Sequence, residues 1–115
     1  MKDFMLIFIG TDYGAMGLSP EEMQNRMGKW FEWQSKMAEQ GVVKGGHALH
    51  PEMRLIKGKE RTVTDLASVE AKELVGGYYI VSAKDIEEAS ELAQGYPDYD
   101  LGGTVEIREV IVFEN

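Results

Sequence analysis

Two stretches of the chain are apolar on both sides of an extended backbone. They are Phe4–Ile9 and Leu74–Ser82, the second interrupted by a pair of glycines. Each is short for a core helix, and apolar side chains at both parities are typical of strands that are covered on both faces. Helices of the same chain can cover one face. Since a chain of this size has little left to cover the other, the pattern predicts a homodimer.

A long amphipathic helix follows the first strand and a short loop. Ser19 is a good N-cap, Pro20 occupies the first helical position and Glu22 completes a capping box. The helix is expected to end near Gly41. Its apolar stripe recurs every three or four residues and consists of Met23, Met27, Trp30, Phe31, Gln34, Met37 and Ala38. Such a stripe is the usual signal of helix-on-sheet packing, and a cofactor pocket is the alternative reading.

A second, shorter helix is predicted after the strand that ends at Ser82. Ser82 is the expected N-cap, with Asp85 three positions further on in the place of the acidic capping-box residue. Gly95 and Pro97 stop this helix, because glycine favours the residue after a helix and proline cannot continue one. This stretch therefore forms a strand followed by a capped helix.

The remaining segments complete an alternation of strands and helices. Val42–His50 is expected to be a strand, Met53–Lys57 and Arg61–Thr64 a hairpin, and Thr104–Phe113 the last strand. Strict alternation along the second strand places on one face Val43, Gly45, His47 and Leu49. The order predicts an α+β, ferredoxin-like (split βαβ) domain over residues 1–115. It has a four-stranded antiparallel sheet, two helices on one face and the extra β-hairpin.

Composition excludes several classes of protein. The chain has 115 residues and a formal net charge of −8, and its 12 lysines and arginines are scattered, so neither nucleic acid nor an anionic membrane is an expected partner. The absence of cysteine rules out a thiolate zinc site and a disulfide framework. Asp3 precedes a short apolar run, unlike the positive start of a signal peptide. We therefore expect a cytoplasmic protein.

Short motifs in family order resemble the YCII-related family, which includes the DGPF-domain proteins. The central ones are Thr64-Asp65, Glu70, Lys72-Glu73 and Gly76-Gly77-Tyr78-Tyr79. Others lie nearer the ends: Leu18-Ser19-Pro20-Glu21-Glu22, Gly45-Gly46, and the segment from Gly102 to Arg108. The resemblance covers nearly the whole chain. It implies a homodimer of ferredoxin-like subunits, the dimeric α/β-barrel type.

The chain departs from the family signature at one turn. Where DGPF-domain proteins have Asp-Gly-Pro-Phe, this sequence has Asp65-Leu66-Ala67-Ser68 and keeps the aspartate alone. The YCII branch is associated with a His and Asp pair, and some relatives resemble cofactor-free lyases that eliminate halide from ring compounds. The resemblance therefore implies a role for Asp65. The position of the family's histidine has no clear counterpart here, and His47 is the candidate partner of Asp65.

His47 and His50 are the only histidines, and their spacing at first suggests a metal site. Residues three apart on a strand point to opposite faces, which argues against a shared metal ion, so no metal is expected. Imidazole exchanges a proton near neutral pH, so His47 could act as general acid or base with Asp65 orienting it. The alternative is a hydrogen-bonded histidine at the surface of the sheet.

The other candidate ligand-binding residues are Asp12, Glu70 and Tyr79, with Tyr78 expected on the opposite face of its strand. A solvated loop charge is the alternative for Glu70. Two classes of function remain. One is a cofactor-free acid/base lyase or isomerase that acts on a small molecule, and the other is a non-catalytic dimeric binding or regulatory module of the sigma-factor-associated type.

Overall fold

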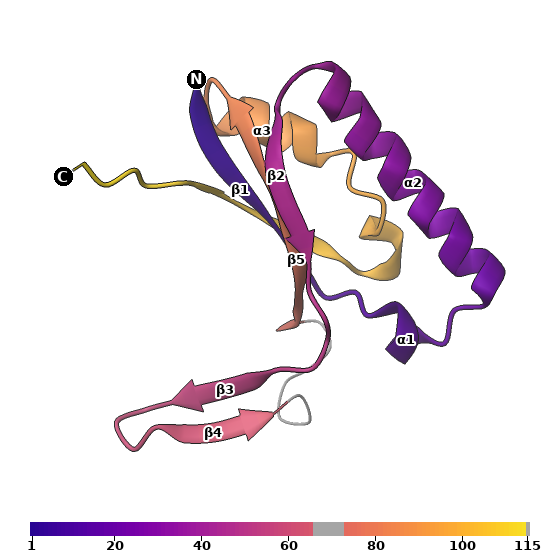
Figure 1. Ribbon diagram of the computed structural model, residues 1–115. Coiled ribbons are helices and arrows are strands. Elements are labelled where there is room, and N and C mark those ends of the chain that lie inside the picture. The colour runs from indigo at the N-terminus through magenta and orange to yellow at the C-terminus, as the bar shows by residue number, and fades with distance from the viewer. Residues whose placement is uncertain (66–72, 115) are drawn as a thin grey trace.

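The strands and helices expected from the sequence are all present in the computed structural model, which describes residues 1–65 and 73–114 (Figure 1). In chain order the elements are β1 (Lys2–Ile9), α1 (Tyr13–Met16), α2 (Pro20–Glu39), β2 (Val43–Ala48), β3 (Arg54–Lys57), β4 (Thr62–Asp65), β5 (Val75–Ala83), α3 (Ile86–Ala93), the 3₁₀-helix η3 (Tyr99–Leu101) and β6 (Thr104–Glu109).

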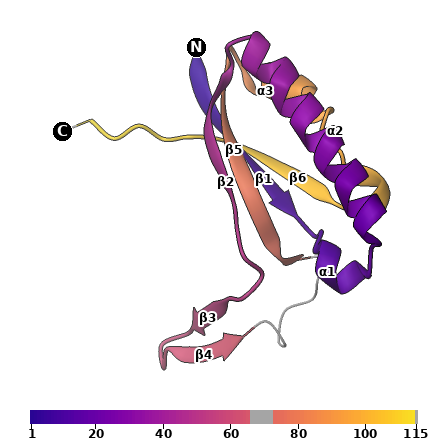
Figure 2. The ribbon, with the colours of Figure 1, turned by 45° about the vertical axis from the view of Figure 1, so that its right-hand side comes forward.

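Four of the strands form one antiparallel sheet in the order β2-β5-β1-β6, and β3 and β4 form a separate two-stranded hairpin. Figures 1 and 2 show α2 and α3 on the same face of the sheet, while the hairpin extends away from it. Both β1-α2-β2 and β5-α3-β6 are strand-helix-strand halves. The predicted ferredoxin-like arrangement is therefore confirmed.

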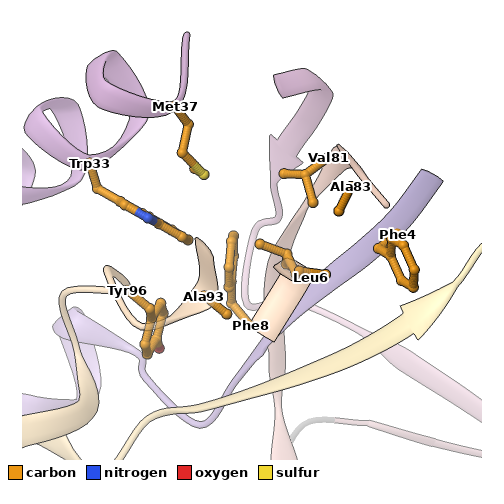
Figure 3. Packing of buried hydrophobic residues seen from close by; sticks show 10 residues of the cluster. Phe4, Leu6, Phe8, Trp33, Met37, Val81, Ala83, Ala93 and Tyr96 are labelled. Atoms are coloured by element: carbon orange, nitrogen blue, oxygen red, sulfur yellow. The ribbon is translucent and has the colours of Figure 1, made fainter. Parts of the chain in front are cut away.

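The core lies between this sheet and the two helices (Figure 3). Alternate residues of β1, namely Phe4, Leu6 and Phe8, are 1%, 0% and 6% exposed. The other buried members come from β5, from the helices and from the segment after α3: Val81, Ala83, Trp33, Met37, Ala89, Ala93 and Tyr96. Burial of this apolar surface is the main term that holds the helices on the sheet.

The face that α2 buries differs from the predicted stripe. Met27 and Phe31 are 65% and 72% exposed, whereas Trp33, which the stripe omits, is 6% exposed. Trp33 packs where Gly95 has no side chain, since a Cβ atom there would overlap the indole ring. Its Nε1 donates to the carbonyl of Leu92 at 3.0 Å. The helix has two apolar faces with the same residue spacing, one with Phe31 and one with Trp33. The packing of Trp33 against Gly95 determines that the face with Trp33 is the buried one.

The start of α2 is as predicted, but the start of α3 is not. Ser19 Oγ accepts from the backbone N–H of Glu22 at 3.1 Å. The N-cap of α3 is Asp85, whose carboxylate accepts from the N–H of Glu88 at 2.9 Å. Ser82 was the expected cap, but β5 continues through it and pairs it with Asp3 of β1. Because Ser82 is paired within the sheet, it is not available to cap the helix, which begins at Ile86.

A β-bulge overturns the predicted faces of β2. Val43 pairs with Val81, but Gly45 pairs with Ile80, so β2 carries one extra residue at Lys44. Because the side-chain period of a strand is two, one extra residue exchanges the faces of everything that follows it. The face toward the helices therefore holds Val43, Gly46 and Ala48, and His47 lies on the opposite face beside Tyr78.

The last strand is shorter than predicted and ends at Glu109 instead of Phe113. The N–H of Val110 still donates to the carbonyl of Asp3 at 2.8 Å, and the chain then leaves the sheet. Ile111 and Phe113 are 73% and 84% exposed. Among the described residues, no helix is both long and apolar enough to cross a membrane.

Candidate small-molecule site

A cavity of about 520 Å³ opens between the sheet and α2. Aromatic side chains from three elements form its walls: Phe8 of β1, Trp30 of α2 and Tyr79 of β5. The ring centroids of Phe8 lie 4.9 Å from those of Trp30 and 5.1 Å from those of Tyr79, both edge to face. Such walls accept a flat apolar molecule, because ring edges and faces pack well against another ring.

The inner end of the cavity holds a buried carboxylate. Asp98 is 1% exposed, and its Oδ2 accepts from the Tyr13 hydroxyl at 2.6 Å and from Trp30 Nε1 at 3.2 Å. The guanidinium of Arg26 lies 3.5 Å from Oδ1. A buried charge is costly unless it is paired and hydrogen-bonded, and these three neighbours meet that requirement.

The surroundings of Asp98 also set the protonation of its neighbours. Burial, followed by the hydrogen bond to Asp98, raises the pKa of Tyr13 far above its usual value, so its hydroxyl keeps its proton. Arg26 donates to both carboxylate oxygens of Asp100, at 2.7 and 2.6 Å. This contact lowers the pKa of Asp100 to about 2. The inner end therefore presents a neutral tyrosine beside an arginine that is shared by two aspartates.

A tight loop after α3 places Asp98 at this depth. Its carbonyl accepts from the N–H groups of Leu101 and Gly103, each at 3.0 Å. A Cβ atom on Gly103 would overlap the hydroxyl of Tyr96, so this position has room for glycine alone. The loop thus folds back on itself and directs the carboxylate toward Tyr13 and α2.

The opposite end of the cavity is its mouth, which is bordered by the exposed Gln34 of α2 and by the edge strand β2 at His47, whose side chain lies on the far face of the sheet. His47 is exposed, and its Nδ1 lies 2.7 Å from the hydroxyl of Tyr78. Tyr78 and Tyr79 point to opposite faces of β5, as predicted, and Tyr79 is the one in the cavity. Burial raises the pKa of Tyr79, so it too remains neutral.

The structure brings some of the predicted site residues to the cavity and places others elsewhere. Tyr79 and His47 line it. Asp12 caps α1, accepting from the N–H groups of Gly14 and Ala15 at 3.1 and 3.4 Å, and thereby positions its neighbour Tyr13. Asp65 is the last residue of β4, paired in register with Arg54, and is not among the lining residues.

Glu70 lies outside the described residues, so its ligand-binding role stays a prediction, as does the His47–Asp65 pair. Within residues 1–65 and 73–114, no three His, Asp or Glu side chains are arranged to hold a metal ion.

Sequence reasoning missed Tyr13 and Asp98. They are 85 positions apart, one in a loop after β1 and the other in a loop before β6, and no spacing rule connects them. The one available signal was an aspartate set among aromatic residues in Tyr96-Pro97-Asp98-Tyr99. That signal does not say which of Asp98 and Asp100 turns inward.

The fold and the cavity together define a small α+β protein with an aromatic pocket between one sheet face and its helices. The family model of the YCII-related domain matches residues 4–114, and the chain belongs to this family. No curated protein matches the sequence significantly.

One solved structure with a similar fold is 5-chloro-2-hydroxyhydroquinone dehydrochlorinase (TftG) from Burkholderia phenoliruptrix AC1100, in complex with 2,5-dihydroxybenzoquinone. The two chains share 14% sequence identity, with a TM-score of 0.46, over 91% of this chain and 90% of that one.

Proposed function

We propose that this protein binds a small, flat, largely apolar molecule in the cavity between the sheet and α2. The observation that carries the proposal is the cavity itself, with three aromatic walls, a polar inner end and a mouth at the edge of the sheet. Its volume of about 520 Å³ falls within the range of small-molecule pockets, and a few polar groups among apolar walls are typical of such pockets.

We further propose cofactor-free acid/base chemistry at the mouth, of the lyase or isomerase type, with His47 as the proton carrier for a ligand group that extends past the edge strand β2 to the far face of the sheet, where the imidazole lies. The contact between Nδ1 of His47 and the Tyr78 hydroxyl favours one tautomer at a time. If Tyr78 donates, Nε2 carries the proton of the neutral ring and can only donate a hydrogen bond. If Nδ1 donates, Nε2 is free to act as a base.

The binding proposal is tested by blocking the cavity from α2. Gln34→Phe adds a ring at the mouth, and Gln24→Phe makes the same change at an exposed position of α2 outside the cavity. Flat ring compounds found by ligand-observed NMR with the parent protein should bind about tenfold or more weakly to Gln34→Phe and normally to Gln24→Phe. Equal binding to both variants would place the ligand elsewhere.

The chemical proposal is tested with a ring ketone among the bound compounds. In D₂O a base removes a proton from the carbon beside the carbonyl and a deuteron replaces it, which NMR detects. His47→Gln should slow this exchange by roughly 10²- to 10⁴-fold, the usual contribution of a general acid or base. His50→Gln changes the other histidine, which lies outside the cavity, and should leave the rate unchanged. The same rate in both variants would remove His47 from the chemistry.

A non-catalytic dimeric module is the second candidate, and the face of the sheet opposite the helices favours it. Met5, Ile7 and Ile80 lie there and are only partly buried within this chain. This candidate would be favoured over the enzyme if the protein is a dimer and binds a ligand in the cavity without catalysing deuterium exchange or turnover.

A further inference from the structure

We infer that Tyr13 and Asp98 determine specificity by forming a hydrogen-bond acceptor at the inner end of the cavity, one that selects a neutral ring carrying a hydroxyl group. This inference rests on the proposed function, because it concerns the ligand of the same cavity.

The hydrogen bonds already present fix the polarity of this end. The hydroxyl of Tyr13 donates its one proton to Asp98 and accepts from Trp30 Nε1 at 2.9 Å. A phenolic oxygen accepts up to two hydrogen bonds, so one lone pair of Tyr13 remains for the ligand. The indole N–H of Trp30 is already shared between Tyr13 and Asp98. The Tyr13 hydroxyl therefore accepts from a ligand, and the protons of Tyr13 and Trp30 are both already used within the protein.

The charge of the inner end disfavours an anionic ligand. Asp98 is buried beside Tyr13, and its ion-pair partner Arg26 also pairs with Asp100, so one cation is shared by two carboxylates. The hydroxyl of Tyr96, on the same loop, is uncharged, because burial raises its pKa. A phenolate would bring a second negative charge close to Asp98 and would have no proton to donate to Tyr13. A neutral phenol avoids both penalties.

Two probes of nearly the same shape test this inference in the parent protein. 4-Nitrophenol carries the hydroxyl, and in 4-nitroanisole a methyl ether replaces it. Both can be followed by quenching of tryptophan fluorescence, because Trp30 is in the cavity wall. At a pH well below the pKa of the phenol, 4-nitrophenol should bind about tenfold more tightly than 4-nitroanisole, the usual effect of one well-made hydrogen bond to a buried acceptor.

Substitutions then assign the preference to Tyr13. In Tyr13→Phe the phenol should lose its advantage, while the affinity for 4-nitroanisole stays the same. Tyr99→Phe is the matched control, because the Tyr99 hydroxyl donates to the carbonyl of Ala93 and does not line the cavity. Circular dichroism checks that each variant folds. The comparison of the two probes in the parent protein needs no variant, so it decides the question even if Tyr13→Phe does not fold.

Raising the pH through the pKa of the phenol supplies the charge test. The affinity for 4-nitrophenol should fall at least tenfold as the probe ionises. 4-Nitroanisole does not ionise, so its affinity reports any change in the protein itself.

The results separate the two proposals. If neither probe binds, or if both bind as well to Gln34→Phe, the cavity is not the ligand site, and the proposed function and this inference fail together. If both probes bind in the cavity with equal affinity, or if the phenolate binds as well as the phenol, the cavity remains a ligand site and the acceptor inference alone is overturned.

Discussion

The two faces of the four-stranded sheet are built from neighbouring residues of the same strands but end in different environments. Along β1, Leu6 is fully buried under the helices, whereas Ile7, the next residue, is only partly buried on the other face. Along β5 the same contrast separates Val81 from Ile80. The residues of the two faces do not differ in hydrophobicity. They differ in what this chain provides to cover them.

An apolar sheet face indicates that something covers it, but it does not identify the cover. The helix-covered face is filled by aromatic rings and also contains the cavity. The open face is an apolar patch next to charged residues of β6, Glu106 and Arg108, which pair in register with Ile7 and Met5. We expect this patch to meet the same patch of a second copy. No helix or strand in the described part of this chain covers it, and two-fold pairing makes a surface its own complement.

The largest expected effect is on the helix-covered face. Leu6→Ala should lower the free energy of unfolding by about 2 to 5 kcal/mol, since it leaves a hole in a closed core. Ile7→Ala removes a similar side chain from the open face and should cost clearly less in dilute protein. Chemical denaturation of both variants measures the difference. Equal losses would show that the two faces are equally closed in the isolated chain.

A charge on the open face should affect association more than folding. The parent protein is expected to have the mass of a dimer by light scattering at micromolar concentration. Ile7→Asp should shift it to a monomer, because an unpaired carboxylate would be buried between the two copies. The circular dichroism spectrum should keep its shape. A parent protein that is already monomeric would leave the second face uncovered and would contradict the dimer.

A smaller effect is expected at the start of the covering helix. Ser19→Ala removes the acceptor for the N–H of Glu22 and should cost on the order of 1 kcal/mol. Ser35→Ala, within the same helix, is the control, since it removes a hydroxyl without a capping role and should cost little. A denaturant titration that gives the same stability for both variants would show that the cap does not hold α2 in place.

The smallest effect concerns the ion pair that ties α2 to the loop of Asp98. The pKa of Asp100 is lowered to about 2 by its hydrogen bonds with Arg26, so the pair stabilises the fold above the ordinary carboxyl pKa, near 4. That stabilisation should disappear as the pH falls from about 4 to about 2. The melting temperature of Asp100→Asn should therefore lie slightly below that of the parent at neutral pH and meet it near pH 2. A constant difference across this range would exclude the ion pair as its cause.

Local sequence signals predicted most of the fold. The apolar runs of Phe4–Ile9 and Leu74–Ser82 became the two central strands, and the Ser19-Pro20 signal marked the first turn of α2 to the residue. These features depend on neighbours in sequence, which is why one chain is enough to find them. The prediction that Tyr78 and Tyr79 point to opposite faces was also confirmed, because alternation along β5 is regular from Gly77 to Ala83.

The rest depended on contacts between distant segments. Trp33 was omitted from the buried stripe, since only its fit against Gly95 distinguishes that face of α2 from the one with Phe31. Tyr13 and Asp98 meet only after both loops have folded. Tertiary packing determines which residues of β2 face the helices after the bulge, and it also brings Tyr13 and Asp98 together from two loops. The local sequence pattern contains little information about either.

The bulge at Lys44 also bears on how the pocket of such a protein can change over generations. With the extra residue, Gly46 and Ala48 face the helices and His47 faces away. Deletion of one codon at Lys44 would remove the bulge and make β2 a regular strand, but the later residues would keep their partners on β5 and His47 would still face away. A change in length at this point would therefore leave the lining of the cavity as it is. Relatives that lack this residue would present the same glycine and alanine to the helices.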